Sequence, residues 1–336
     1  MPERFDDICD VPGILVGHDT LSDAATGCTV IICQRTALGA VDVRGGAPAT
    51  RETDLLSPLC MMREVHAICL SGGSAFGLEA ASGVARALEE RGIGFDVGVT
   101  RVPIVPAASL FDLNTGSATV RPDAASGVRA LEAAAGSPVA QGSVGAGTGA
   151  TVGKTGGPGL HVKGGLGSAS GTLPDGHTVG ALVAVNAVGD IYDPDTGAIV
   201  AGARHPSGVG WLNATPQRLT SQTNPFAGGN TTIGVIATDA PLSKAGLAKV
   251  AQMTHDGYAR AIRPVHTPFD GDTIFALSTA NTEAAGNEAP LLGLVGAMAA
   301  HAMERAIVKA VRAATSLGGV PALRDLAWAR SIEEQI

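Results

Sequence analysis

The chain alternates short apolar runs with turn residues, and two kinds of periodicity stand out. Five apolar, often β-branched runs predict strands: 28–33, 64–70, 180–186, 231–238 and 272–278. Apolar positions at helical spacing predict three long helices: 76–90, 244–260 and 291–313. These elements do not follow the steady strand–helix–strand rhythm of a doubly wound sheet. We therefore expect layered sheets covered by helices.

Two segments depart from this pattern. Residues 141–171 contain 12 glycines in 31 positions, which favours loops and short strands packed backbone to backbone. Residues 199–225 show little periodicity and are rich in Pro, Asn, Ser and Thr. This second segment is predicted to be an exposed connection.

Composition narrows the class of protein. The 336 residues carry a formal net charge of −8, and only 3% are aromatic. Binding to nucleic acid is disfavoured, because it needs a basic groove or aromatic stacking platforms. The hydrophobic content of 45% argues against disorder. Charged residues make up only 16%, and with the Ala-rich helices this favours a homo-oligomer.

The cysteines and the chain start bear on the cellular compartment. All five cysteines fall within the first 70 residues and none has CxxC spacing, so we expect reduced thiols. The acidic start lacks the basic region of a signal peptide. The apolar stretch 291–303 is interrupted by His301 and is too short to span a bilayer. The prediction is a soluble cytoplasmic protein without a membrane partner.

Several motifs resemble known sites but lack required residues. Residues 147–155 look like a phosphate-binding loop, yet Thr148 stands where the Walker pattern requires glycine. Lys154 in this loop is either solvated or paired with an acid. Residues 193–197 begin like a calcium loop but lack its sixth-position glycine and closing glutamate. No HxxxH pair and no GxSxG elbow occurs, so no metal and no cofactor are predicted.

Three segments carry a family resemblance: 228–241 (GGNTTIGVIATDAP), 266–275 (HTPFDGDTIF) and 70–112, which begins LSGGSAFGLE. Together they resemble the self-processing DmpA-type aminopeptidases, a family that includes β-aminopeptidases and nylon-oligomer endohydrolases. The resemblance extends over nearly the whole chain. It implies an α/β fold, the αββα sandwich of the N-terminal-nucleophile type that ornithine acetyltransferases share.

The resemblance also implies how the chain matures. Residues 1–336 would form a single hydrolase domain that cuts itself between Asn230 and Thr231. The products, an α chain of residues 1–230 and a β chain of residues 231–336, would remain partners. Thr231 would then be the N-terminal nucleophile. Taken without the family, the GGNTT motif is an ordinary turn that enters a strand.

Physical chemistry explains why such a cut would activate the chain. A threonine hydroxyl is a weak nucleophile until a base removes its proton. An N-terminal α-amine has a pKa of about 7.7–8.0 and lies within reach of its own hydroxyl. An internal Thr231 has only an amide nitrogen, which cannot act as that base. Glycines at 228 and 229 would let the backbone bend for the acyl shift.

Two acidic residues lie close together in the sequence. On an extended chain Asp270 and Asp272 leave the same face, about 7 Å apart. There they would hold the Thr231 ammonium and orient its hydroxyl, as the matching pair does in nylon-oligomer hydrolases. Their like charges would raise one pKa unless Lys154 neutralises them. The alternative is a turn with solvated acids.

The remaining site residues come from the resemblance. Asn186 would supply an oxyanion-hole donor from its side-chain amide, although a buried Asn with satisfied hydrogen bonds is the alternative. Lys154 matches the family lysine near the nucleophile. Phe111 falls where some members place a tyrosine, and phenylalanine cannot donate that hydrogen bond. Residues 107–110 lack the acidic Gly-Glu element of β-aminopeptidases.

The predicted function is an autoprocessed amide hydrolase that releases N-terminal residues from small peptides or amides. An endo-type hydrolase of polyamide oligomers is the next choice. Two further alternatives remain open: an acyltransferase of the ornithine acetyltransferase type, and an uncut binding protein without activity.

Overall fold

A computed structural model describes residues 4–213, 229–282 and 286–329. The four helices in this part are α1 (Glu79–Glu90), α2 (Ala124–Glu132), α4 (Lys244–Ala261) and α5 (Ala289–Ala313). Nine strands form the main hydrogen-bonded sheet: β1 (Ile14–Leu21), β2 (Thr26–Val43), β3 (Thr50–Arg51), β4 (Glu64–Ser71), β7 (Ala107–Ser109), β10 (Gly165–Thr172), β11 (Thr178–Asn186), β14 (Thr231–Thr238) and β16 (Thr273–Ser278). Shorter strands are β5 (Phe95–Asp96), β6 (Arg101–Val102), β8 (Thr151–Val152), β9 (Val162–Lys163), β12 (Asp190–Tyr192), β13 (Ile199–Ala201) and β15 (Ile262–Arg263).

The long strand β2 joins two layers of the main sheet. Its first half pairs with β1, and its second half pairs with β16. The pairing with β4 shifts register between Ile32 and Ala37, where the strand changes neighbours. β2 therefore belongs first to a layer with β1, β4 and β7, and then to a layer with β16, β14, β11 and β10.

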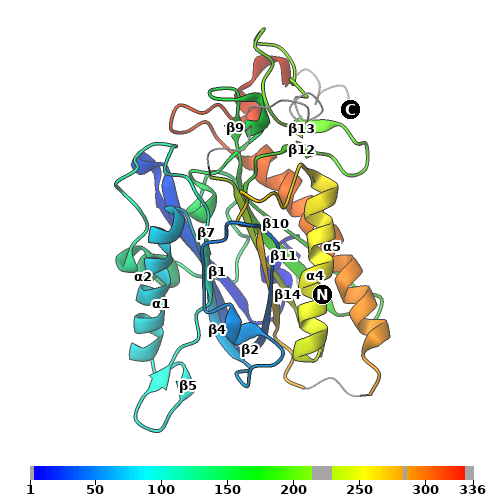
Figure 1. Ribbon diagram of the computed structural model, residues 1–336. Coiled ribbons are helices and arrows are strands. Elements are labelled where there is room, and N and C mark those ends of the chain that lie inside the picture. The colour runs from blue at the N-terminus through cyan, green and yellow to red at the C-terminus, as the bar shows by residue number, and fades with distance from the viewer. Residues whose placement is uncertain (1–3, 214–228, 283–285, 330–336) are drawn as a thin grey trace.

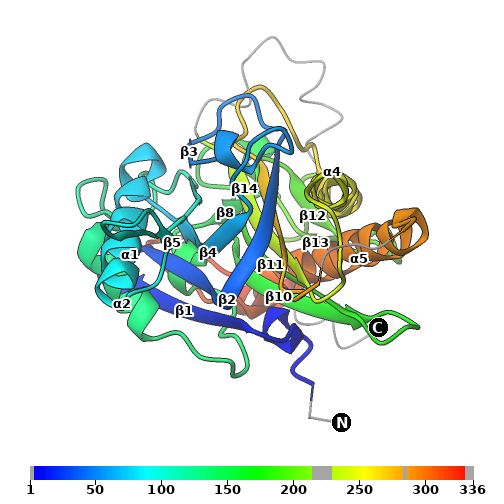
Figure 2. The ribbon, with the colours of Figure 1, turned by 90° about the horizontal axis from the view of Figure 1, so that it is seen from below.

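Helices cover the outer faces of these two layers. Figures 1 and 2 show α1 and α2 on one side of the strands and α4 and α5 on the other. Three separate apolar cores match this arrangement, one under each helix pair and one between the strand layers. The middle core includes Ile31, Ile68, Leu182, Val235 and Phe275. The expected αββα order is confirmed, with the two sheets continuous through β2.

Most of the predicted elements are present. All five predicted strands and all three predicted helices occur, although the helix predicted over 76–90 begins with a 3-10 turn at Ser74–Leu78. Residues 141–164 form loops and short strands, as expected, but residues 165–171 belong to β10, an eight-residue strand of the main sheet. The interpretation of 199–225 as a connection is wrong at its start, because β13 pairs with β12 there. Residues 214–225 lie outside the described part.

Helix α5 is the longest helix described. Its 25 residues are long and apolar enough, by length and composition alone, to cross a membrane, so the expectation that this apolar stretch is too short to span a bilayer is wrong. The helix packs against β10, β11 and α4. Helices in the core of a protein can have the same length and apolar composition as a membrane span. All five cysteines are free, in agreement with the expected thiols.

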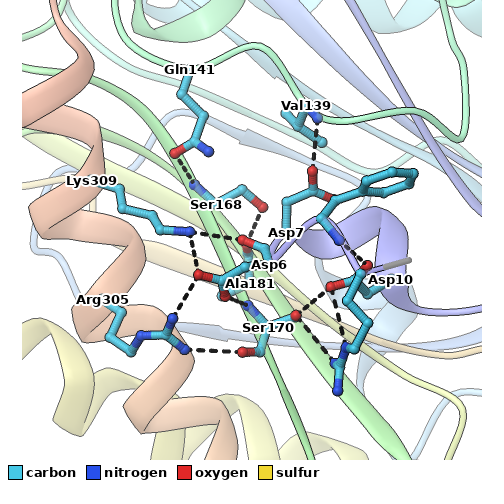
Figure 3. A network of polar contacts seen from close by, with 12 residues as sticks. Asp6, Asp7, Asp10, Val139, Gln141, Ser168, Ser170, Ala181, Arg305 and Lys309 are labelled. Atoms are coloured by element: carbon cyan, nitrogen blue, oxygen red, sulfur yellow. Dashed lines mark hydrogen bonds and ion pairs between the residues drawn. The ribbon is translucent and has the colours of Figure 1, made fainter. Parts of the chain in front are cut away.

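A polar network fastens the N-terminal segment to α5 (Figure 3). The Asp6 carboxylate accepts from Arg305 Nη2 and from Lys309 Nζ, both at 2.7 Å. Although burial opposes ionisation, hydrogen bonds from Lys309 and the Ser170 amide hold the pKa of Asp6 below its usual value. This network links residues that lie on opposite sides of the Asn230–Thr231 bond.

Candidate active site

Three segments that are distant in sequence meet where β14 begins. Antiparallel pairing places Asn186, the last residue of β11, opposite Thr231, the first residue of β14. β16 runs parallel to β14, so the residues that precede β16 lie beside those that precede β14. Asn230 and Asp270 accordingly form a parallel bridge. Sheet topology alone thus gathers the residues around the Asn230–Thr231 bond.

The bond between Asn230 and Thr231 is enclosed, and Thr231 is only 5% exposed. The Thr231 hydroxyl donates to the carbonyl oxygen of Asn230, and the Gly271 amide donates to the same oxygen at 3.0 Å. A Cβ at position 271 would lie 2.8 Å from Thr231 Oγ1, so glycine keeps this approach open. The carbonyl next to the candidate nucleophile is therefore polarised by two donors.

The two acidic residues are buried and occupied by hydrogen bonds. Asp272 Oδ1 accepts from the Thr232 amide at 2.8 Å, and Asp270 Oδ2 accepts from the Thr267 amide at 2.6 Å. They lie in the turn before β16, as in the alternative interpretation, but neither is solvated. Burial and the neighbouring Asp272 raise the pKa of Asp270 to about 6, although Lys154 opposes this shift.

The half-buried Lys154 contacts the buried Asn186 beside these acids. Lys154 Nζ donates to Asn186 Oδ1 at 2.8 Å and to the carbonyl oxygens of Asn186 and Gly229. Burial lowers the pKa of Lys154 to about 7, against the attraction of Asp270. Lys154 is therefore not the solvated lysine of the alternative interpretation. Asn186 Oδ1 also accepts from the Thr151 amide at 3.0 Å.

Phe111 contacts the site through its backbone and its ring. Its carbonyl oxygen accepts from Asn186 Nδ2 at 2.8 Å. A Cβ at Gly229, where φ is +52°, would lie 2.1 Å from Phe111 Cγ. The ring thus packs on the residues just before the candidate cleavage site. Residues 107–109 are buried in β7.

Sequence reasoning missed several residues around this centre. His266 contacts Asp272 through its ring and its backbone, although it stands in a motif already singled out. Two further charged side chains are buried, Asp112 directly after Phe111 and Lys163 in β9. Lys163 Nζ donates to the Thr148 carbonyl oxygen at 2.5 Å, and Asp112 accepts from the Gly73 amide at 2.7 Å. In the sequence, Asp112 stands at the end of the segment 70–112 and Lys163 in a glycine-rich stretch, and neither was given a role.

No group of three His, Cys, Asp or Glu side chains that could hold a metal ion occurs among residues 4–213, 229–282 and 286–329. The chemistry open to the site is that of a hydroxyl, two carboxylates, an amide and an amine.

Comparison with known proteins defines the class. The L-aminopeptidase D-Ala-esterase/amidase of Ochrobactrum anthropi, a variant of the Ntn hydrolase fold, matches with a TM-score of 0.75 at 21% identity, covering 100% of this chain and 95% of its own. The fold is therefore that of the N-terminal-nucleophile hydrolases. Peptidase family S58 matches residues 6–323, and the chain belongs to this family.

Two curated relatives are also similar. An uncharacterized aminopeptidase of Mycobacterium bovis is 46% identical, over 95% of this chain and 97% of its own length. A 6-aminohexanoate-oligomer endohydrolase of Kocuria sp. is 37% identical, over 80% of this chain and 74% of its own. The protein is thus a hydrolase of an aminopeptidase family.

The buried Lys163 should affect how stability changes with pH. Burial lowers its pKa to about 7, against the attraction of Asp112. The unfolded chain keeps its lysines near pKa 10.4 and so binds more protons between these values. The contribution of Lys163 to the free energy of unfolding therefore rises with pH above about 7. We expect Lys163→Met to reduce the gain in stability between about pH 7 and pH 8.5.

Urea unfolding at both pH values measures this gain. Every sample carries Thr231→Ala, which replaces the predicted nucleophile, and intact mass checks that the chain is continuous. The same change at exposed Lys249 is the matched control and should leave the gain unchanged. If stability rises equally between the two pH values in Lys163→Met and in its background, the lowered pKa of Lys163 is contradicted.

Proposed function

We propose that the chain cuts itself between Asn230 and Thr231 and that the freed Thr231 hydrolyses amides with a free amino end. One observation carries the proposal: the Thr231 hydroxyl contacts the carbonyl group that it would attack, and Gly271 donates to the oxygen of that group. Amide donors at such an oxygen stabilise the negative charge that develops there.

Self-cleavage would proceed as an N-to-O acyl shift. Thr231 Oγ1 adds to the Asn230 carbonyl carbon, the bond from that carbon to the Thr231 nitrogen breaks, and this nitrogen receives the hydroxyl proton. Asp270 is the candidate base that carries the proton, because it lies beside Asn230 in a parallel bridge and its raised pKa of about 6 is close to neutral pH. Water then hydrolyses the ester and leaves a carboxylate on Asn230 and an amine on Thr231.

Substrate hydrolysis would reuse the same hydroxyl. The Thr231 amine accepts the hydroxyl proton as Oγ1 attacks the substrate carbonyl, and it then protonates the departing amine. Asn186 would donate to the oxyanion, while Asp270 and Asp272 balance the charge of the Thr231 ammonium. Lys154 would orient Asn186 through the 2.8 Å bond to its Oδ1. Water finally releases the acyl group from Thr231.

The relatives support two classes of substrate. The aminopeptidase of Mycobacterium bovis, 46% identical, supports short peptides and amino-acid amides. The endohydrolase of Kocuria sp. acts by its name on 6-aminohexanoate oligomers, which makes short polyamides the second candidate. Product analysis distinguishes them, because an aminopeptidase releases only the first residue whereas an endohydrolase also releases internal fragments.

The mass of the purified wild-type protein tests the proposal. We expect two chains, residues 1–230 and 231–336, that copurify because β11 and β14 pair across the cut. N-terminal sequencing should find Thr231 at the start of the second chain. A single full-length species that hydrolyses peptides would overturn the proposed nucleophile, and one that binds peptides without turnover would favour a binding protein.

A further inference from the structure

A histidine with no role so far lies behind one of the two acidic residues. Asp272 Oδ2 accepts from His266 Nδ1 at 2.8 Å and from the His266 amide at 3.0 Å. The other oxygen, Oδ1, accepts from the Thr232 amide at 2.8 Å. The Asp272 side chain is only 2% exposed. Asp272 therefore connects His266 to the amide that follows the candidate nucleophile.

This connection gains importance once the chain is cut. Before cleavage Thr231 is held by peptide bonds on both sides, but afterwards only its bond to Thr232 remains. The position of the new chain end then depends on how firmly the Thr232 amide is fixed. Asp272 fixes that amide, and a carboxylate held from both sides has few alternative rotamers.

The backbone of His266 has an uncommon conformation, and side chains of α4 pack against its ring. Its φ is +56°, a left-handed conformation that only a few per cent of non-glycine residues adopt, most often Asn, Asp and His. Two side chains of α4 pack against the ring: His255 edge-on, with centroids 4.7 Å apart, and Tyr258 stacked at 6.0 Å. Strained conformations of this kind persist where neighbouring groups fix them, and they gather at functional sites.

We infer that His266 is a positioning residue, which acts through Asp272 to hold Thr231 in its attacking position after the chain is cut. The inference rests on the proposed function. Donation from Nδ1 to Asp272 sets the ring tautomer, so a neutral His266 presents Nε2 as an acceptor. This Nε2 is buried and has no hydrogen-bond partner among the described residues, which leaves the bond to Asp272 as the polar contact of the ring.

Two substitutions separate positioning from simple packing. His266→Asn keeps an N–H donor at the place of Nδ1 and tolerates a positive φ, but it removes the aromatic ring. His266→Gly also accepts the backbone conformation and removes the donor as well. The measurements are the kcat and KM for an aminoacyl p-nitroanilide, expressed per cut chain, together with the thermal unfolding midpoint.

We expect His266→Gly to lower kcat by about 10²-fold with little change in KM, because a nucleophile misplaced by about 1 Å loses that much. His266→Asn should keep kcat close to the wild-type value even where its unfolding midpoint falls. If the glycine variant does not fold, His266→Phe removes the Nδ1 donor and keeps a ring beside His255 and Tyr258. Its strained positive φ should lower the unfolding midpoint, and the folded protein should show the same loss of kcat.

The outcomes also separate this inference from the function on which it rests. Wild-type protein that stays uncut and inert contradicts the proposed function itself. Cut and active wild-type protein, with an unchanged kcat in the variants that lack the donor, overturns only the role of His266. An equal loss of kcat in His266→Asn and His266→Gly would also overturn it, because the ring and not the donor would then matter.

Discussion

Thr231→Ala protein will be recovered as one uncut chain that does not hydrolyse amides. The substitution removes the oxygen that would attack the Asn230 carbonyl, so neither self-cleavage nor substrate acylation can begin. Loss of a hydrolase nucleophile lowers kcat by roughly 10⁴–10⁶-fold. Denaturing gels and intact mass report the cut, and release of p-nitroaniline from an aminoacyl anilide reports the activity.

Conservative variants make this result specific. Thr231→Ser keeps the hydroxyl and should still be cut and active. Thr232→Val is the matched control at the next position, because Thr232 is fully buried and its hydroxyl has no hydrogen-bond partner among the described residues. This control should be cut like the wild type. Two chains of unchanged size from Thr231→Ala would place the scissile bond elsewhere.

Much of the architecture could be predicted from local signals. Strands 231–238 and 272–278 each have an apolar centre, Ile233–Ala237 and Ile274–Leu277, with polar residues at both ends, and turn residues precede each strand. The sequence could not reveal that the two strands are parallel neighbours, a pairing that brings Asn230 beside Asp270. Only the family resemblance placed these residues in one site before the fold was known.

The residues that sequence reasoning missed share a physical cause. The ring of His266 packs against α4, Asp112 accepts from Gly73, and Lys163 donates to Thr148. Such contacts between separate segments leave no periodic pattern in the sequence. Lys163 is fully buried in β9, yet a lysine in a glycine-rich stretch reads as solvated by default. Lys154 is not expected to be a solvated lysine, because the family resemblance places it near the nucleophile, which its spacing in the sequence does not show.

Asn186→Asp will lower kcat by roughly 10²–10³-fold, the usual loss for one oxyanion-hole donor. Aspartate keeps an acceptor for Lys154 Nζ and for the Thr151 amide, which Asn186 Oδ1 engages at 2.8 and 3.0 Å. It removes the Nδ2 donor, one hydrogen of which bonds to the Phe111 carbonyl oxygen at 2.8 Å. The second hydrogen is the one available to an oxyanion. The measurement is kcat per cut chain.

The alternative is that the buried Asn186 only forms hydrogen bonds to neighbouring groups, and it predicts a different result for the same variants. Under that alternative Asn186→Asp would change the unfolding midpoint and leave kcat intact. Asn186→Leu separates the roles further, because leucine removes the donor and also leaves the buried Lys154 amine without its Oδ1 acceptor. We therefore expect Asn186→Leu to lose both activity and stability, whereas Asn186→Asp loses chiefly activity. An aspartate variant with wild-type kcat would exclude the amide of Asn186 from the oxyanion hole.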